Sequence, residues 1–434
     1  MPCRRSDRDL RLSLGNQPGG DRGGRPASDA CGRPPDRAVS RLPEGAHRAG
    51  APPIGVPRPI DSPPVRAAHS VPPDRRIPPL HGILRRPAES GRPPAPVRVA
   101  GDRLRRTVRV LVTGATGFTG GHLARSLAAH GETVRALVRD TTRATAALAS
   151  AGIGIAHGDV RDRAALVEAS AGIDIVYHVA AVYRQAGLSP DVYRQVNAYA
   201  VRDLLEAAAG NGVRRFVHCS TVGVHGDVEH PPANEDAPLK PGDVYQETKL
   251  EGERLAREAA RRLGLEVTIV RPTGIYGPGD RRLLKLFRGV ARRRWITLGS
   301  GDIYYHLTYI DDLVEGFRLC GEHPAAANRT YILAGGEVTT LNELVAVVAD
   351  VAGVPVPRVH LPVWPFRAAG AVCEAVCAPF GIEPPVYRRR VDFFTKSRAF
   401  DISRARHELG YTPRIGLREG IARTLDWYRQ QGWL

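Results

Sequence analysis

The sequence predicts an α/β fold in which a doubly wound parallel sheet is followed by a smaller C-terminal lobe. From Thr107 onward, short apolar runs alternate with amphipathic runs of helical spacing. The first apolar run, Val108–Thr113, ends at a turn with glycines at every third position, and beyond Arg271 the alternation loosens. Regular alternation indicates parallel strands covered by helices on both faces, and the looser remainder indicates the added lobe.

The strands and helices can be placed in order along this part of the chain. The apolar runs predict strands at Val108–Thr113, Thr133–Val138, Ile153–His157, Ile175–Val179, Arg215–Cys219 and Glu266–Val270. The amphipathic runs predict helices at Gly121–Ala129, Arg161–Ala169, Ala198–Ala209 and Val244–Leu263. The nucleotide-binding core should occupy mainly residues 107–278, and a partly helical lobe mainly residues 279–310 and 354–400.

Residues 1–106 have a different composition from the rest. The first hundred positions hold 20 of the 36 prolines, together with many Gly and Arg residues, and show no sustained periodicity. Such a segment buries too little apolar surface to offset its ordering entropy, so the sequence predicts a disordered extension. A misplaced start codon would also explain this stretch.

The net charge of +17 does not by itself indicate a nucleic-acid partner. Only four of the 62 basic residues are lysines, and residues 1–106 alone hold 21 Arg against 10 Asp and Glu, which is +11 of the total. The six cysteines lack the spacing of a metal or disulfide site, so we expect no metal. The sequence also contains no signal peptide and no apolar run long enough for a transmembrane helix, which favours a cytoplasmic protein.

The glycine turn predicts a binding site for a dinucleotide. A strand, a glycine-rich turn and a helix in this order place a pyrophosphate on the N-terminus of the helix. The spacing is Gly-x-x-Gly-x-x-Gly. We therefore expect the cofactor to be contacted by Gly114, Thr116, Gly117, Phe118 and Gly120.

Three further motifs follow in a fixed order. Ser220 and Thr221 come directly after a strand, Tyr245 and Lys249 lie four residues apart on a predicted helix, and Arg271-Pro272 opens a run that ends in Tyr-Gly-Pro. Together with the glycine turn, these motifs resemble the extended short-chain dehydrogenases/reductases, the NAD(P)-dependent epimerase/dehydratase type, over residues 107–434. The resemblance implies a Rossmann-type sheet with a substrate-binding lobe.

The resemblance implies a catalytic role for four residues. Tyr245 would exchange a proton with the substrate, and a Lys249 cation close by would favour the tyrosinate. In this family the lysine also binds the nicotinamide ribose. The hydroxyl of Thr221 would bind the substrate oxygen, with Ser220 as its neighbour or substitute.

The resemblance also implies contacts to the cofactor outside the turn. The pair Asp159 and Val160 would contact the adenine, Ala180 and Ala181 would let the backbone approach the cofactor, and the backbone at Pro272 would line the nicotinamide pocket. Asp159 is also expected to cap the helix that follows it. Asn197 would brace the active site, or would be an ordinary polar residue at a helix start.

The end of the second predicted strand favours NADP over NAD. An acidic side chain at this point would bind the 2′-hydroxyl of NAD. The sequence instead places Val138 there, followed by Arg139 and only then Asp140. The missing acid and the adjacent Arg139 indicate a 2′-phosphate, although Asp140 could still reach the ribose.

The sequence leaves three alternatives for the reaction and its substrate. The first is an epimerase/dehydratase with hydride transfer at a CH–OH/C=O centre, acting on a sugar nucleotide. The second is a net NADP-dependent reductase or dehydrogenase of a sterol-, flavonoid- or terpenoid-like molecule, for which the apolar residues 363–366 and Phe380 could form a pocket, or could equally be core. The third is a non-catalytic NAD(P)-sensing protein.

Other side chains and partners are expected as follows. Candidate side chains for a diphosphate are Arg281, Arg282 and residues 388–390. Asp311 and Asp312 should cap the helix that follows them. A small-molecule substrate and a homodimer are expected from the family.

Overall fold

The computed structural model describes residues 107–140, 143–185, 187–377 and 391–434. The predictions for residues 1–106 lie outside the described residues, as do those for Phe380 and residues 388–390. No helix in the described part of the chain is both long enough and apolar enough to cross a membrane.

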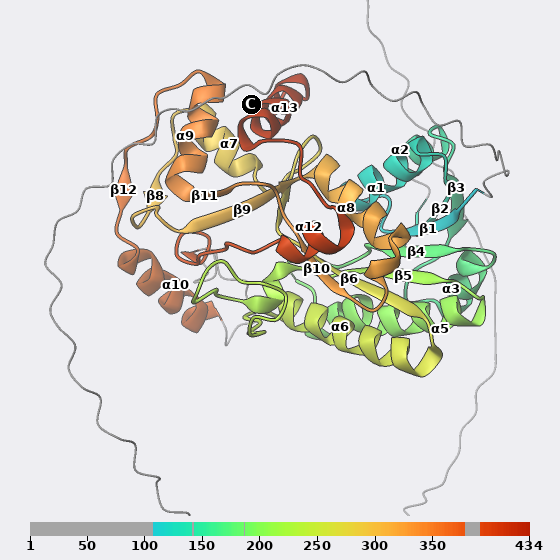
Figure 1. The fold of residues 1–434 in the computed structure, drawn as a ribbon. Coiled ribbons are helices and arrows are strands. Elements are labelled where there is room, and N and C mark those ends of the chain that lie inside the picture. Colours follow the sequence, from blue (N-terminus) through green and yellow to red (C-terminus); the bar gives the residue numbers. More distant parts are fainter. Residues whose placement is uncertain (1–106, 141–142, 186, 378–390) are drawn as a thin grey trace, which may run out of the picture. The chain divides into compact units, whose positions relative to one another are not determined.

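The central element is a seven-stranded parallel sheet, with the strand order β10-β6-β5-β4-β1-β2-β3 (Figure 1). All six neighbouring pairs run parallel. The predicted doubly wound α/β fold is therefore confirmed. Its strands are β1 (Arg109–Thr113), β2 (Thr133–Val138), β3 (Gly154–His157), β4 (Ile175–His178), β5 (Arg215–Cys219), β6 (Glu266–Pro272) and β10 (Thr330–Leu333).

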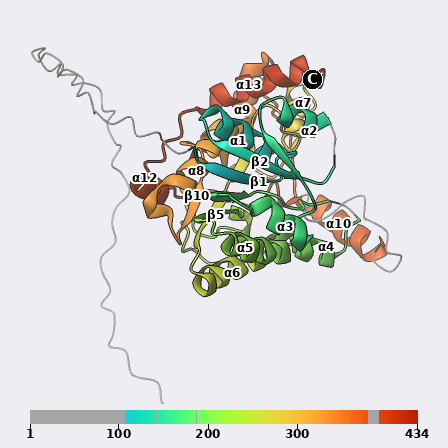
Figure 2. The ribbon, with the colours of Figure 1, turned by 90° about the vertical axis from the view of Figure 1, so that its right-hand side faces the viewer.

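Helices cover both faces of this sheet (Figure 2). Side chains alternate across the strands, so Val110 and Val112 of β1 pack into one apolar cluster and Leu111 into the other. The first face carries α1 (Phe118–Ala129), α2 (Arg143–Ala149) and α8 (Ile310–Glu322). The second carries α3 (Arg163–Ser170), α5 (Ala200–Gly210) and α6 (Val244–Leu263).

The order of the strands reverses between β1 and β4. From β1 the chain moves outward to β2 and β3, and it then crosses back to β4 and continues outward on the other side. Ligands of such sheets bind at the carboxyl ends of the strands at this reversal. The short elements at this edge are α4 (Pro190–Arg194), the π-helix η1 (Gln195–Tyr199) and the 3-10 helix η2 (Val222–His225).

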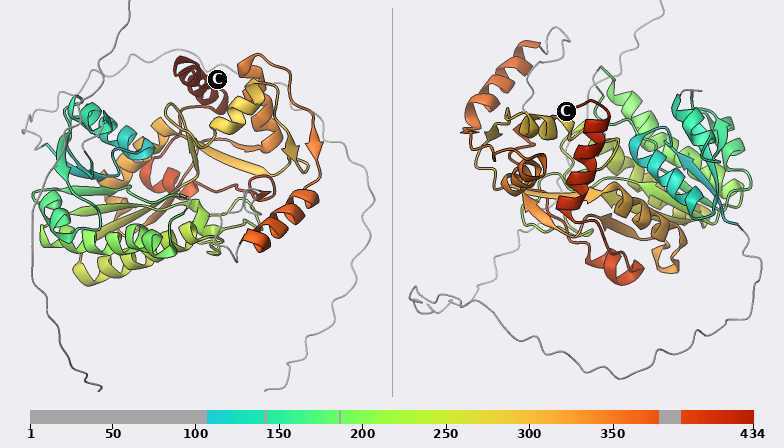
Figure 3. Two further views of the ribbon diagram at one scale, coloured as in Figure 1. Left: turned by 180° about the vertical axis from the view of Figure 1, so that it is seen from behind. Right: turned by 90° about the horizontal axis from the view of Figure 1, so that it is seen from above.

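A second group of elements forms the C-terminal lobe (Figure 3). Strand β9 (Tyr304–Tyr309) pairs with β7 (Gly274–Tyr276) and β11 (Val338–Thr340). A two-stranded pair joins β8 (Thr297–Leu298) to β12 (His360–Leu361). The helices of this part are α7 (Leu284–Ala291), α9 (Leu341–Ala352), α10 (Trp364–Cys377) and α13 (Leu417–Gln430).

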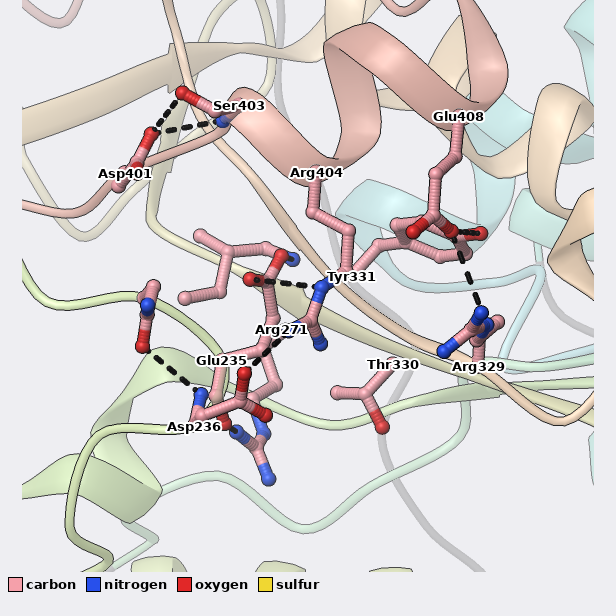
Figure 4. Close-up of polar contacts among 12 residues, drawn as sticks. Glu235, Asp236, Arg271, Arg329, Thr330, Tyr331, Asp401, Ser403, Arg404 and Glu408 are labelled. Carbon is pink, nitrogen blue, oxygen red and sulfur yellow. Dashed lines mark hydrogen bonds and ion pairs between the residues drawn. The ribbon is translucent and has the colours of Figure 1, made fainter.

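Residues from two distant segments hold the outer strand β10 in place (Figure 4). The Ile332 amide donates to Glu235 Oε1 at 2.9 Å, and the Tyr331 hydroxyl donates to Glu408 Oε2 at 2.7 Å. Glu408 belongs to α12 (Ser403–Leu409), and a short 3-10 helix, η3 (Pro324–Ala326), precedes the strand. These contacts give the sheet a seventh strand that the sequence analysis did not predict, because its four residues show no alternation of their own.

Two predicted helix caps are wrong. Helix α3 begins at Arg163 and is capped by Asp162, whereas the Asp159 carboxylate accepts the Arg161 amide in the preceding turn. Neither Asp311 nor Asp312 caps α8: both lie within its first turn, and Asp312 accepts the amides of Arg414 and Ile415 at 2.8 and 3.1 Å. The second carboxylate thus ties α8 to the segment before α13.

Candidate functional site

The glycine turn between β1 and α1 brings backbone segments too close together for side chains. Gly114 has φ +74°, and a Cβ there would lie 2.7 Å from the Ala180 nitrogen. A Cβ at Gly120 would lie 2.3 Å from the Gly114 oxygen. Both positions therefore require glycine for close approach, and Gly114 also requires it for its backbone angle.

The N-terminus of α1 fits a pyrophosphate. Gly117 occupies the cap position, no side chain caps the helix, and its first turn holds no acidic residue. The orphan amides and the positive end of the helix dipole are therefore available to an anion. Thr116 is exposed beside this turn, Phe118 is half-buried, and Ala180 lies against Gly114 from β4 with Ala181 exposed after it.

Charged side chains gather at the ends of β2 and β3. Asp159 accepts from the Arg161 guanidinium at 2.9 Å, and Arg139 Nη1 lies 3.9 Å from the same carboxylate. The hydrogen bond from Arg161 lowers the pKa of Asp159 below its usual value. Val160 is half-buried next to this group. An anion at this point would meet two guanidinium groups and one carboxylate.

Helix α6 carries both Tyr245 and Lys249. The helix is capped by Asp243, which accepts the Gln246 amide at 3.0 Å. Residues four apart lie on the same side of a helix, so the two functional side chains point the same way. Tyr245 is half-buried and Lys249 is 1% exposed.

Asn197 connects this helix to the loop after β4. Its side-chain oxygen accepts the Val182 amide at 2.9 Å, and its side-chain nitrogen donates to the Val182 carbonyl and to Thr248 Oγ1 at 3.1 Å. The residue lies in the π-helix η1 and is fully buried. Asn197 therefore fixes the loop that follows Ala180 and Ala181 against α6.

Burial controls the ionisation of Tyr245 and Lys249. Burial raises the pKa of Tyr245 well above its usual value, Cys219 and Tyr183 raise it further, and Arg282 and Arg184 oppose the rise. Burial also lowers the pKa of Lys249. Among the described residues, the cost of desolvating the Tyr245 phenolate thus outweighs the nearby positive charge. The role expected of Lys249 toward Tyr245 stays a prediction.

The two candidate hydroxyls after β5 have different partners. Thr221 Oγ1 accepts the Gly223 amide at 3.0 Å and caps the short helix η2. The Ser220 hydroxyl instead donates to Glu253 Oε1 at 2.6 Å in the protein interior. The Thr221 hydroxyl proton stays available for a substrate oxygen, whereas the Ser220 proton is already used.

Glu253 and Arg271 form a buried ion pair beneath this loop. Arg271 donates to the two carboxylate oxygens at 2.9 and 2.7 Å, and the two side chains are 2% and 0% exposed. Arg271 also donates to the Glu235 carbonyl at 2.9 Å (Figure 4) and contacts His225 Nε2 at 3.1 Å. The sequence analysis quoted Arg271 only as part of a motif and missed Glu253, which lies one turn beyond Lys249 on the same helix.

Aromatic and cationic side chains surround Tyr245. The Tyr183 ring meets the Tyr245 ring edge-on at 4.9 Å, and Tyr183 is 46% exposed. The Arg184 guanidinium lies 5.5 Å from the centre of the Tyr183 ring, and that of Arg282 lies 6.0 Å from it. Arg282 also lies 5.6 Å from the Phe118 ring, which places the segment between β7 and α7 beside the glycine turn.

The other candidate substrate residues lie elsewhere. Arg281 stacks on Trp433 at 4.8 Å from the ring centre. Trp364 is 73% exposed at the start of α10, and Phe366 is exposed on the same helix. Of the two candidate arginines that the structure describes, Arg282 thus lies beside Tyr183 and Phe118, and Arg281 does not.

The motif around Pro272 leads from the sheet into the lobe. Pro272 ends β6 and is buried, and β7 begins two residues later. The Pro278 carbonyl contacts His122 Nε2 of α1 at 3.0 Å. The segment after β6 is therefore attached to the helix that starts at the glycine turn.

Comparison with known proteins agrees with this geometry. The model of the NAD dependent epimerase/dehydratase family matches residues 110–334, more than half of the chain. The chain belongs to this family. The protein is therefore an enzyme of the extended short-chain dehydrogenase/reductase type. NAD is the cofactor that the family's name gives.

Two relatives and one solved structure illustrate the range of the family. The chain is 32% identical to sterol demethylase protein B of Methylococcus capsulatus, over 75% of this chain and 99% of that protein. It is 28% identical to 3beta-hydroxysteroid-dehydrogenase/decarboxylase isoform 2 of Arabidopsis thaliana, over 73% of this chain, and matches only 61% of that protein's length. The solved dTDP-glucose 4,6-dehydratase DesIV of Streptomyces venezuelae, with NAD bound, has 28% identity, covers 75% of this chain and 98% of its own, and gives a TM-score of 0.60.

Proposed function

We propose that this family member transfers a hydride at the alcohol or ketone carbon of an apolar, sterol-like substrate. The contact that carries the proposal is the exposed Tyr183 ring set edge-on against Tyr245 at 4.9 Å. An exposed aromatic ring beside the proton-transferring phenol offers an apolar ring system a surface to pack on. The end-to-end similarity to the sterol demethylase protein B supports the same substrate class.

Tyr245 is proposed as the proton donor to the substrate oxygen. Because burial raises its pKa, the phenol holds its proton at neutral pH and can give it to a carbonyl oxygen that becomes an alcohol. Thr221 would donate a second hydrogen bond to the same oxygen. The nicotinamide cofactor would supply the hydride.

The residues proposed to hold the cofactor line the reversal of the sheet. The orphan amides of α1 would bind the pyrophosphate, Ala180 and Ala181 would let the dinucleotide approach the sheet, and Lys249 would bind the nicotinamide ribose. The buried position of Lys249 supports this role, because a ribose hydroxyl would give its ammonium a partner in place of water.

NADP is proposed in preference to NAD. The Arg139 side chain is 68% exposed beside the Asp159–Arg161 pair, so its guanidinium is accessible to a 2′-phosphate. In binding titrations, Arg139→Ala should weaken NADPH binding by about tenfold while NADH binding changes little. Arg163→Ala, which removes an exposed arginine paired with Glu206, is the control. Equal losses for both cofactors would contradict the assignment.

A second candidate function is hydride transfer on a sugar nucleotide. The guanidinium groups of Arg184 and Arg282 near Tyr183 favour it, because they could pair with a diphosphate. The similarity to the dTDP-glucose 4,6-dehydratase supports the same candidate.

Activity assays on the full chain separate the two candidates. The protein is denatured to identify any dinucleotide it releases, and the native protein is assayed for NADPH oxidation with a 3-ketosteroid and for conversion of UDP-glucose and dTDP-glucose. The proposal predicts reversible NADPH binding and reduction of the ketosteroid. Tightly bound dinucleotide with turnover of a sugar nucleotide alone would favour the second candidate.

Variants test the role of Tyr245 separately from the substrate. Tyr245→Phe should lower kcat by about 10²–10⁴-fold while NADPH binding is preserved, because only proton transfer is lost. Tyr331→Phe, which removes a phenol hydroxyl at the outer strand β10, should keep wild-type turnover. Wild-type turnover by Tyr245→Phe would refute the role.

A further inference from the structure

Exposed apolar side chains are concentrated in one part of the lobe. Of the fourteen large hydrophobic residues exposed among the described residues, eight belong to position 296 or to the segment 356–376. The two segments lie together, since β8 pairs with β12 and the Thr297 amide donates to the Val359 carbonyl at 3.0 Å. The eight residues are Ile296, Val356, Val359, Leu361, Trp364, Phe366, Val372 and Val376. A cluster of this kind marks an interaction surface.

Helix α10 presents an apolar side to the solvent. Trp364, Val372 and Val376 are 73%, 64% and 59% exposed and follow one another at helical spacing, and the exposed alanines at 368 and 375 lie between them. Gly370, on the opposite side of the helix, is its one buried residue. Figures 2 and 3 show that α10 projects from the rest of the described chain.

As far as the structure describes it, α10 is too short to span a membrane. Fourteen residues make a helix of about 21 Å, shorter than the ~30 Å hydrocarbon core of a bilayer. A helix of this size with one apolar side and a tryptophan at its start can lie in the plane of the membrane interface.

The two segments that carry most of this apolar surface hold only positive charges. Residues 292–298 and 354–369 contain five arginines, all exposed, and no Asp or Glu. Glu374 of α10 is half-buried and lies outside the apolar side of the helix. A second copy of the chain related by a two-fold axis would bring these like charges together. An anionic bilayer would instead pair with the arginines, whose apolar stems can lie along its surface. The five arginines are Arg292, Arg293, Arg294, Arg358 and Arg367.

We propose that α10 and the β8–β12 edge form a docking surface for an anionic lipid bilayer. The outer side of α10 enters the interface, and the arginines at the end of α7 and beside β12 contact the lipid phosphates. The protein is then held at the membrane without a spanning helix.

Vesicle sedimentation with the full chain tests the docking surface. The wild type should bind vesicles of phosphatidylglycerol and phosphatidylcholine, bind pure phosphatidylcholine less, and lose affinity as salt is raised. The double variant Val372→Asp/Val376→Asp should bind at least about tenfold more weakly, because it places charges on the inserted side. Val167→Asp changes a valine of α3 that is 46% exposed and lies outside this surface, and it should bind as the wild type does. Circular dichroism checks that each variant is folded.

The same variants distinguish the other possible occupants of this surface. Unchanged vesicle binding by the double variant would overturn the proposal, and would assign any binding to the arginine-rich residues 1–106. A change of oligomeric state in sedimentation velocity without lipid, with vesicle binding unchanged, would assign the surface to a second copy. Failure of the wild type to bind phosphatidylglycerol would likewise overturn the proposal. None of these outcomes depends on activity, so they are independent of the proposed reaction.

Discussion

Two neighbouring parts of the same sheet edge are stabilised in different ways, one by close backbone contacts and the other by buried charges. The β1–α1 turn is formed by backbone alone, with glycines where a Cβ would collide with Ala180 or with Gly114 itself. The β5–α6 region is held by buried charge, with Ser220, Arg257 and Arg271 all bonded to the Glu253 carboxylate. The first part leaves the first backbone amides of α1 free for a ligand, whereas in the second part the Glu253 carboxylate is paired by side chains of the protein itself.

The difference shows how each part can fail. A glycine turn fails when an atom is added, because the space that a Cβ would need is already filled by backbone atoms. A buried ion pair fails when an atom is removed, because the remaining charge is left without a partner in a medium of low dielectric constant. The following changes separate these two kinds of failure.

The largest expected loss of stability comes from breaking the buried pair. Arg271→Met should lower the free energy of unfolding by about 3–5 kcal/mol, because it leaves the Glu253 carboxylate buried with its main partner gone. Chemical denaturation measures the change. Lys240→Ala breaks an ion pair of similar length whose side chains are more than half exposed, and should cost less than about 1 kcal/mol. Equal losses for the two variants would show that burial does not set the strength of the pair.

Adding a single methyl group should damage the glycine turn. Gly120→Ala places a Cβ against the Gly114 backbone, so we expect a loss of about 1–3 kcal/mol in stability and weaker NADPH binding. Gly210→Ala is the matched control, because a Cβ at this position, at the end of α5, would have no neighbour within 4 Å. This variant should lower neither the stability nor the affinity for NADPH. Normal NADPH binding by Gly120→Ala would mean that the cofactor does not use this turn.

The pH dependence of stability should report on Glu253. Burial alone would raise the pKa of Glu253, but the hydrogen bonds and charge of Arg271 outweigh it and lower the pKa below its usual value. The carboxylate therefore contributes stability that is fully present above the unfolded-state pKa of about 4.3 and is lost as the pH falls below it. The stability difference between the wild type and Glu253→Gln should shrink in that range. A difference that grows on acidification would contradict this sign.

The smallest expected effect concerns a helix cap in the nucleotide-binding half. Asp162→Ala removes the carboxylate that accepts the amides of Ala164 and Ala165, and should cost about 1 kcal/mol. Asp159→Ala should leave α3 intact, since Asp159 bonds Arg161 in the turn before the helix. Thermal unfolding of the two variants measures the loss of stability. A larger loss for Asp159→Ala would mean that Asp159 caps α3, as the sequence suggested.

Much of the fold could be predicted because its signals are local. Six strands of the central sheet lie within two residues of their predicted bounds, and α6 begins and ends as expected at Val244 and Leu263. The helix expected at 198–209 is α5 at Ala200–Gly210, preceded by the π-helix that holds Asn197. Strand β10 could not be predicted, because its partners are β6 and the distant Glu235 and Glu408.

The sequence by itself determined six strands of the sheet, the glycine turn and the placement of Tyr245 and Lys249 on one side of a helix, because each depends on residues a few positions apart. Only the tertiary structure decided which hydroxyl after β5 keeps a free proton, since the partner of Ser220 lies 33 residues away on α6. It also decided the direction of the pKa shift of Tyr245. Desolvation depends on everything packed around a group, and that surrounding is assembled from distant parts of the chain.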